Sequence, residues 1–426
     1  MTRAACFVLA LTLSTSPALA QLRGHGGPVR ALAVSADGAT AISGSFDTAV
    51  IRWSLARNAA EQVLRFHDGA VNAVALLSDG RMVSAGEDKR IALWVAGADR
   101  PAQVLEGHEA PVVALAISPD ATTLASASWD HTVRLWSLKG DGVRVLEGHQ
   151  QNVNGVGFTP DGRALVSVGY DATLRIWPLT GSVEPIIVTV PTPLNSIVVA
   201  PNGEIAAGGA DGKVYFLSDR GDIIGGIETG PTPIISIAIS SDGALVAAAG
   251  IRGSVAIIER KTHTLARTLI GPGLPVWSLA FLPDNHTLLT GGADRMIRRW
   301  NAATGDPLGS VALGAADDPL AAYAGDHGAE VFRACIACHT LSADDGNRAG
   351  PTLAGLFGRR IATLPGYRFS EALKNLEIVW TPETVAKLFE VGPAAYTPGT
   401  KMPEQRIGSA DDREALVKFL EKATKK

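Results

Sequence analysis

The sequence predicts a ring of seven four-stranded β units followed by a small all-α domain. Three observations predict it: a repeat with a period near forty over residues 24–313, short apolar runs separated by turn residues inside each repeat, and a change to helical periodicity from residue 326. A repeat of this period is typical of architectures built from stacked or circularly arranged units. At 426 residues the chain also exceeds the usual size of one core, so we expect more than one domain.

The first twenty residues have the pattern of a secretory signal. Arg3 gives a positive start, residues 4–13 are apolar, and Ala18 and Ala20 form a small-residue cleavage site. We expect cleavage after Ala20 and a mature periplasmic protein that begins at Gln21. The alternative is a membrane anchor, but the apolar run is shorter than the ~20 residues needed to span a bilayer. No later segment is apolar enough to span one.

The repeats end in similar sequences, at spacings of 39 to 43 residues. The clearest are SGSFDTAVIRW ending at Trp53, SAGEDKRIALW at Trp94, SASWDHTVRLW at Trp136 and SVGYDATLRIW at Trp177. Weaker copies end at Phe216, Ile257 and Trp300. Within a repeat, turn residues such as Ala36, Asp37 and Gly38 separate runs of strand length, which predicts four antiparallel strands. Seven such units close a ring.

These repeats resemble the WD-repeat family, with a Gly-His near the start and a Trp-Asp-like end. The resemblance implies an all-β, seven-bladed β-propeller. It also implies a buried hydrogen-bonded set in each blade, complete here four times: His25, Ser43, Asp47 and Trp53; His67, Ser84, Asp88 and Trp94; His108, Ser126, Asp130 and Trp136; His149, Ser167, Asp171 and Trp177. The fifth blade keeps only Asp211, the sixth keeps none, and the seventh keeps Thr290, Asp294 and Trp300. The outermost strand of the seventh blade comes either from residues 307–313 or from residues 21–23.

The same resemblance implies a partner-binding rim on the propeller. The family contacts partners at the start of the innermost strand and just before the blade aspartate. Those positions hold Arg30, Asn72, Asn154, Asn195 and Trp277, then Phe46, Glu87, Trp129 and Tyr170. We expect Arg30, Phe46, Trp129, Tyr170 and Trp277 to bind a protein, because Trp, Tyr and Arg are enriched at interface hot spots. Ordinary packing along the rim is the alternative.

The predicted domains are a signal peptide at residues 1–20, the propeller at 21–313, a linker at 314–325 and a helical domain at 326–426. The linker is rich in Gly, Ala, Asp and Pro and reaches roughly 40 Å if extended, so it does not fix the domain orientation. In the last domain, residues 382–391 have Thr381 as a candidate N-cap. Leu416, Phe419 and Leu420 form the stripe of a C-terminal helix.

Cys335, Cys338 and His339 form a CXXCH run, the spacing at which c-type haem is attached. Two thiols bond the macrocycle and the adjacent histidine reaches the iron, so we expect one covalent haem c. A thioredoxin-like redox pair would need a preceding strand and a βα unit, and a zinc site would need a second ligand pair. The sequence contains neither. Cys6 leaves with the signal, so the mature chain has no further thiol.

Met402 is the predicted second axial ligand. It lies in a stretch rich in proline and glycine, which suits a rigidly held ligand better than a core side chain. His327 is the rival ligand. Thioether ligation would raise the potential and complete the coordination sphere, as outer-sphere electron transfer requires.

Residues 326–426 resemble the class I, mitochondrial-type cytochrome c family. Beside CIACH, the motifs that carry the resemblance are GPTL at residues 350–353, GLFGR at 355–359, PGY at 365–367, Trp380 and PGTKM at 398–402. The resemblance implies that the carbonyl of Pro351 orients His339 and that Arg359, Trp380 and Thr400 lie near the haem propionates. Phe369 and Leu388 stand where the family commonly has tyrosines, which predicts a different potential.

We expect a one-electron carrier whose propeller docks a protein redox partner, such as a dehydrogenase complex. The alternative is a second catalytic or metal centre in the propeller, since quinone-dependent dehydrogenases and haem d nitrite reductases also join a propeller to a cytochrome c. Against it, the histidines outside the blade sets, His131, His263 and His286, lie on different blades. The net charge of −4 and the lack of a basic stripe argue against nucleic acid as a partner. No small-molecule substrate is evident.

Overall fold

A computed structural model describes most of residues 21–426. The described residues are 21–181, 183–271, 274–308, 320–333, 335–336, 339–343, 350–365, 367, 369, 371–398, 400, 402 and 406–425. The predicted signal peptide and the first half of the predicted linker, residues 314–319, lie outside them. Of the helices that the structure describes, none has both the length and the apolar character needed to cross a bilayer.

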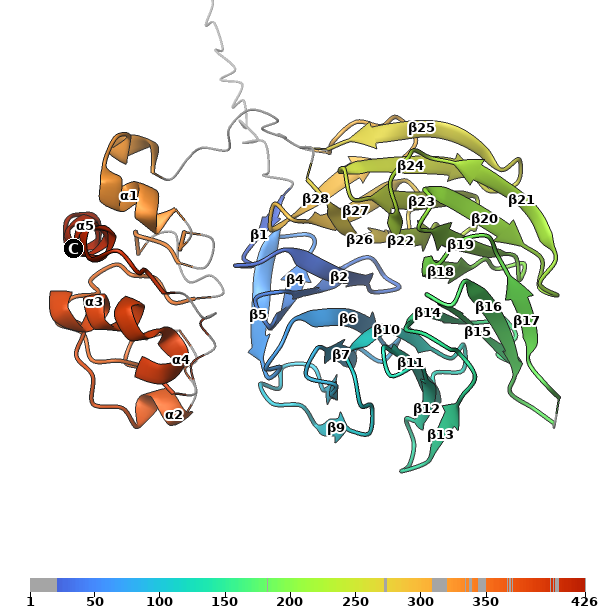
Figure 1. Cartoon of the computed structure of the whole chain (residues 1–426), viewed down its shortest axis with the longest axis horizontal. Coiled ribbons are helices and arrows are strands. Elements are labelled where there is room, and N and C mark those ends of the chain that lie inside the picture. Colours follow the sequence, from blue (N-terminus) through green and yellow to red (C-terminus); the bar gives the residue numbers. More distant parts are fainter. Residues whose placement is uncertain are drawn as a thin grey trace, which may run out of the picture.

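The described residues form seven four-stranded antiparallel sheets arranged as blades around a ring (Figure 1), which confirms the predicted propeller. Blades one to six contain β2–β5, β6–β9, β10–β13, β14–β17, β18–β21 and β22–β25. In chain order the strands are β1 (Leu22–Arg23), β2 (Val29–Val34), β3 (Thr40–Ser45), β4 (Ala49–Ser54), β5 (Ala59–Arg65), β6 (Val71–Leu76), β7 (Met82–Gly86), β8 (Ile91–Trp94), β9 (Gln103–Leu105), β10 (Val112–Ile117), β11 (Thr123–Ser128), β12 (Val133–Ser137), β13 (Val143–Leu146), β14 (Val153–Phe158), β15 (Ala164–Gly169), β16 (Thr173–Pro178), β17 (Ile186–Thr189), β18 (Leu194–Val199), β19 (Ile205–Gly209), β20 (Lys213–Leu217), β21 (Ile223–Glu228), β22 (Ile234–Ile239), β23 (Leu245–Gly250), β24 (Ser254–Glu259), β25 (Thr264–Ile270), β26 (Val276–Phe281), β27 (Thr287–Gly292) and β28 (Met296–Asn301).

Burial follows the position of each strand in its blade. Second strands such as β3 are buried along nearly their whole length because neighbouring blades cover both of their faces. Outer strands such as β17 are largely exposed. The β2–β3 turn shows how the chain reverses: Gly38 has a φ of 69°, and Asp37 Oδ1 accepts from the Ala39 N–H at 2.9 Å.

The seventh blade is closed by the N-terminal strand, which decides the question that the sequence left open. Its order is β1-β28-β27-β26, and Leu22 pairs with Ile297. The side chain of Leu22 is fully buried. Directly after β28, Pro307 makes one isolated β-bridge with Trp300. A ring closed by both ends of the repeat region ties the first blade to the last.

The four complete blade sets form as predicted. In blade one, His25 Nδ1 donates to Asp47 at 3.0 Å, His25 Nε2 accepts from the Ser43 hydroxyl at 2.7 Å, and Trp53 Nε1 donates to the same hydroxyl at 2.7 Å. This network assigns the histidine tautomer. Blades two, three and four repeat it. Each set satisfies buried polar groups between two strands and a loop, so it fixes the blade geometry.

A small helical domain follows the propeller. Its helices are η1 (Ala321–Tyr323), α1 (His327–Phe332), α2 (Glu371–Lys374), α3 (Pro382–Val391), α4 (Pro393–Tyr396) and α5 (Ala410–Ala423). The predicted helix 382–391 is confirmed, with Thr381 and Thr384 forming a reciprocal capping box. Where α1 crosses α5, a Cβ on Gly328 would overlap the Ala415 carbonyl oxygen. Glycine is therefore required at this close crossing.

Candidate haem-binding site

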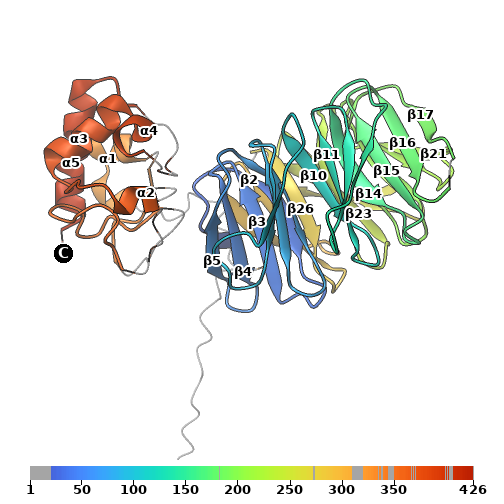
Figure 2. The ribbon, with the colours of Figure 1, turned by 90° about the horizontal axis from the view of Figure 1, so that it is seen from below.

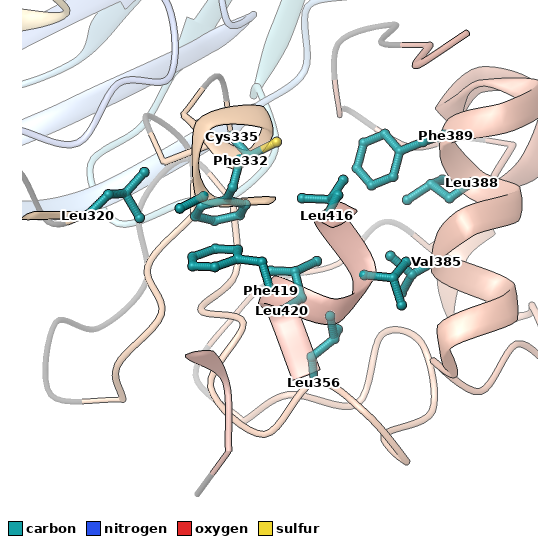
Figure 3. Close-up of a cluster of buried hydrophobic side chains, with 12 residues drawn as sticks. Leu320, Phe332, Cys335, Leu356, Val385, Leu388, Phe389, Leu416, Phe419 and Leu420 are labelled. Atoms are coloured by element: carbon teal, nitrogen blue, oxygen red, sulfur yellow. The ribbon is translucent and has the colours of Figure 1, made fainter. Parts of the chain in front are cut away.

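A large apolar cavity lies mainly within the helical domain. It holds about 1430 Å³ of empty space, including its open mouth. Buried side chains from the end of α1, from α3 and from α5 form its walls (Figure 3): Phe332, Cys335, Val385, Leu388, Phe389, Leu416 and Leu420. Mostly apolar walls of this kind are typical of sites that bind a small molecule or a cofactor.

One helical turn positions the attachment residues. After α1 the Cys335 N–H donates to the Phe332 carbonyl at 2.7 Å, and the His339 N–H donates to the Cys335 carbonyl at 3.0 Å. This spacing keeps the thiol and the imidazole on one side of the cavity, and both line it. Cys335 is 8% exposed and belongs to the core. Cys338, the second predicted attachment residue, lies outside the described residues.

His339 is held as a neutral ligand-type imidazole. Its Nδ1 donates to the Pro351 carbonyl at 2.8 Å, which confirms the contact that the resemblance implied. The other nitrogen, Nε2, then carries the lone pair. Burial lowers the pKa of His339; the hydrogen bond to Pro351 opposes this shift, and the charge of Arg65 adds to it. A neutral imidazole oriented by a carbonyl is the usual state of a metal-binding histidine.

Met402 lines the same cavity and packs against its core. A turn holds it: the Thr400 N–H donates to the Thr397 carbonyl at 3.0 Å, and the Met402 N–H donates to the Thr400 hydroxyl at 3.1 Å. The rival ligand His327 lies elsewhere, with its exposed ring against Asp412 at 2.7 Å. The cavity therefore contains Met402 and not His327.

Arg359, Trp380 and Thr400, the predicted propionate neighbours, all line the cavity. The guanidinium of Arg359 donates to the carbonyls of Thr352 at 3.1 Å and Ala354 at 3.0 Å. Its backbone also pairs with that of Trp380. The Arg359 side chain thus holds the loop at 352–358 in place at the cavity wall. A contact between Arg359 and a haem propionate stays a prediction. Phe369 and Leu388 line the cavity as well.

Two propeller residues that the sequence did not single out for this site also line the cavity, Asp47 and Arg65. The Nη2 atom of Arg65 is buried, and no described residue accepts a hydrogen bond from it. Sequence patterns gave no signal for this contact because the linker leaves the domain orientation open. Apolar walls, a thiol, an oriented imidazole, a thioether and an unsatisfied guanidinium together fit a haem, whose face is apolar and whose edge carries carboxylates.

The predicted partner-binding residues lie in blades one, three, four and seven. The Phe46 and Trp277 rings lie 6.0 Å apart, and the Arg30 guanidinium lies 5.1 Å from the Trp277 ring. Trp129 and Tyr170 belong to blades three and four, and Trp129 Nε1 donates to Asn154 at 3.1 Å. Phe46, Trp129 and Tyr170 are 42%, 37% and 40% exposed. These are high values for aromatic side chains.

The remaining propeller histidines do not come together. His263 stacks on Phe216 at 4.1 Å and binds Glu204 at 2.9 Å, so it joins two blades. Within the described parts of the chain, no three His, Cys, Asp or Glu side chains converge as a metal site would require. The structure thus offers no support for a metal centre built from described propeller residues.

Comparison with known proteins agrees with this architecture. Residues 325–424 match the family model described as "Cytochrome c". Cytochrome c of Cochliobolus lunatus is 42% identical over 99 residues, which are 23% of this chain and 91% of that protein. Residues 70–313, more than half of the chain, match the model of the "IFT122 first beta-propeller", and residues 17–54 match "WD domain, G-beta repeat". The chain belongs to the WD β-propeller and cytochrome c families.

Other relatives of the cytochrome c domain come from plants and bacteria. Cytochrome c of Arabidopsis thaliana is 42% identical over 99 residues, covering 23% of this chain and 88% of that protein. Cytochrome c2 of Blastochloris viridis is 40% identical over 95 residues, which cover 22% of this chain and 74% of that protein. The family binds haem c covalently, so the cytochrome c domain carries one-electron chemistry. The WD propeller indicates protein interactions.

Proposed function

We propose that this protein is a periplasmic one-electron carrier in which His339 and Met402 ligate the haem iron and the propeller docks a redox partner. The observation that carries the proposal is the 2.8 Å hydrogen bond from His339 Nδ1 to Pro351, in a cavity that Met402 also lines. The signal-like residues 1–20 support export.

The site residues suit electron transfer better than substrate chemistry. When bound, the haem supplies an iron that cycles between two oxidation states. Pro351 fixes the orientation of His339, and the turn at Thr400 holds Met402, so both side chains would be held in place as the iron changes its oxidation state. With both His339 and Met402 bound to it, the iron would have no open position for a substrate. The apolar walls exclude water, and this lowers the reorganisation energy of each electron transfer.

The exposed rim aromatics support docking by the propeller. Trp129 and Tyr170 lie on adjacent blades, and large aromatic side chains there bury much area at low conformational cost. A partner bound on this rim would contact the propeller while the cytochrome c domain exchanges the electron. The partner expected from this arrangement is a protein, in particular an enzyme that releases single electrons.

The experiment uses the mature holoprotein as bait in periplasmic extract and then measures haem reduction by each captured oxidoreductase with its own substrate. Replacement of both Trp129 and Tyr170 by Ala should slow reduction by the physiological donor about tenfold or more, the usual effect of losing interface hot spots. Reduction by a small dye should not change. Replacement of Val143 and Val145, which are exposed on the outer strand β13, is the matched control. Equal rates in the rim and control variants would refute docking at this rim.

A further inference from the structure

The propeller contributes one wall of the haem cavity. Arg65 is the last residue of β5, the outer strand of blade one, and Asp47 lies in the β3–β4 turn of the same blade. Both line the cavity. Figures 1 and 2 show β5 on the side of the propeller that faces the helices. The haem environment is therefore built from both domains.

Aromatic contacts hold Arg65 at this wall. Its guanidinium carbon lies 4.7 Å from the centre of the Tyr367 ring, a cation–π distance. The Tyr367 ring in turn lies 4.7 Å from the ring of Phe369 at an angle of 58°. Both rings line the cavity. Arg65 is thus the propeller end of a row of three side chains along the cavity.

The guanidinium of Arg65 has a donor left over. Its Nη2 atom is buried and finds no acceptor among the described residues. A buried charged donor without an acceptor costs more free energy than a neutral one. The nearby carboxylate of Asp47 is already occupied, since it accepts from His25, from the Gly26 N–H at 2.6 Å and from the Ala49 N–H at 2.9 Å. No described residue supplies the missing acceptor, so a group outside this set must accept the hydrogen bond.

The other cationic side chains of the cavity are engaged elsewhere. Arg359 donates to two backbone carbonyls of its own domain. Arg360 is exposed and donates to the Leu376 carbonyl at 3.3 Å. Among the described lining residues, Arg65 is the arginine with a buried donor still available. Each haem brings two carboxylates, and a guanidinium is the side chain best shaped to bind one.

We propose that Arg65 binds a haem carboxylate, so that the propeller supplies a residue of the haem site and raises the reduction potential of the haem. A positive charge at the haem edge disfavours the ferric state, which carries one charge more than the ferrous state. A covered edge is also drier, which favours the ferrous state in the same way. A partner that moves blade one would then change the potential through Arg65. The inference rests on the haem and depends on neither the donor nor the compartment.

Redox titration of the holoprotein tests this contact by comparing variants in which residue 65 carries a positive, neutral or negative side chain. Arg65→Gln should lower the ratio of ferrous to ferric haem, measured at a fixed applied potential, about tenfold. For a one-electron couple this corresponds to a reduction potential about 59 mV lower. Arg65→Lys should recover most of that ratio, and Arg65→Glu should lower it further than Gln. Arg57→Gln is the control, because Arg57 is an exposed arginine of the same blade that pairs with Glu61. It should leave the ratio unchanged.

The order of the variants decides the result. A ratio in Arg65→Gln equal to that of the wild type would overturn the proposal, as would an equal shift in Arg57→Gln. If Arg65→Gln fails to retain haem, Arg65→Lys decides: haem content and potential close to wild type support the carboxylate contact, and loss of haem as in Gln overturns it. If Met402 does not bind the iron, the visible spectra of all variants would differ in the same way from those of a thioether-bound haem. The order of their reduction potentials would not change, so this outcome can be told apart from failure of the Arg65 contact.

Discussion

Leu22 of β1 pairs with Ile297 of β28, so the first and last strands of the propeller lie side by side in one sheet. The pairing is short, because β1 contains only two residues. Both side chains are fully buried and belong to one core cluster. This cluster also includes Trp53 of the first blade set, so closure and blade packing depend on the same side chains.

Leu22→Ala should therefore destabilise the whole propeller. Truncating a buried leucine commonly costs about 2–5 kcal/mol, and here it also weakens the strand that closes the ring. Urea unfolding followed by tryptophan fluorescence measures the effect. Ile223→Ala, at an exposed position of outer strand β21, is the control and should change the free energy of unfolding by less than about 0.5 kcal/mol. A similar loss in both variants would contradict closure by β1.

Gly328→Ala should destabilise the cytochrome c domain while the propeller stays intact. A methyl group at residue 328 would overlap the Ala415 carbonyl and force α1 away from α5. Overpacking of this kind costs about 1–3 kcal/mol. Because α1 leads into the CXXCH turn, the loss should appear in the unfolding curve followed by haem absorbance. Gly408→Ala is the control, since a methyl group at residue 408 would have no atom of the described residues within 4 Å. Equal losses of stability in the two variants would show that the close contact between α1 and α5 at Gly328 is not the cause.

The blade sets should make the propeller sensitive to acid. Burial raises the pKa of Asp88, but the hydrogen bond and charge of His67, together with hydrogen bonds from Arg90 and the Asp68 N–H, lower it to about 2 from an ordinary value of 3.8. Because the pKa is lower in the folded state, ionised Asp88 stabilises the fold above about pH 4, and this contribution is lost as the pH falls towards 2. Its size at neutral pH is on the order of 2 kcal/mol.

Asp88→Asn should thus be less stable than the wild type at pH 7, and the difference should shrink as the pH falls from 4 to 2. Thermal unfolding across this range measures it. Asp141→Asn, at an exposed position of blade three, should show no such convergence. A difference between wild type and Asp88→Asn that stays constant with pH would show that Asp88 acts only by packing.

The repeats predicted the propeller from sequence because each blade carries its own markers. The His, Ser, Asp and Trp positions of four blades predicted the hydrogen bonds that the structure shows, since their spacing follows from strand length and turn type. Strand β1 could not be assigned beforehand, because two residues carry too little pattern to compete with residues 307–313. The link between His339 and Pro351 was implied by motif order and is present.

Arg65 could not be predicted as part of the haem cavity. Its role depends on how two separately folded domains meet, and a linker of small and polar residues does not encode that geometry. Within its own blade, Arg65 has the pattern of an ordinary outer-strand residue. Only the assembled chain places it against Tyr367.

The most direct test of the account is the spectrum of the ferric holoprotein in Met402→Ala, compared with Met296→Ala. Met296 lies on β28 of the propeller and should have no influence on the haem. If Met402 is the second axial ligand, Met402→Ala abolishes the weak red charge-transfer band of thioether-bound ferric haem and lowers the potential, and Met296→Ala leaves both unchanged. A band that persists in Met402→Ala would contradict ligation by Met402 and, with it, the six-coordinate electron carrier.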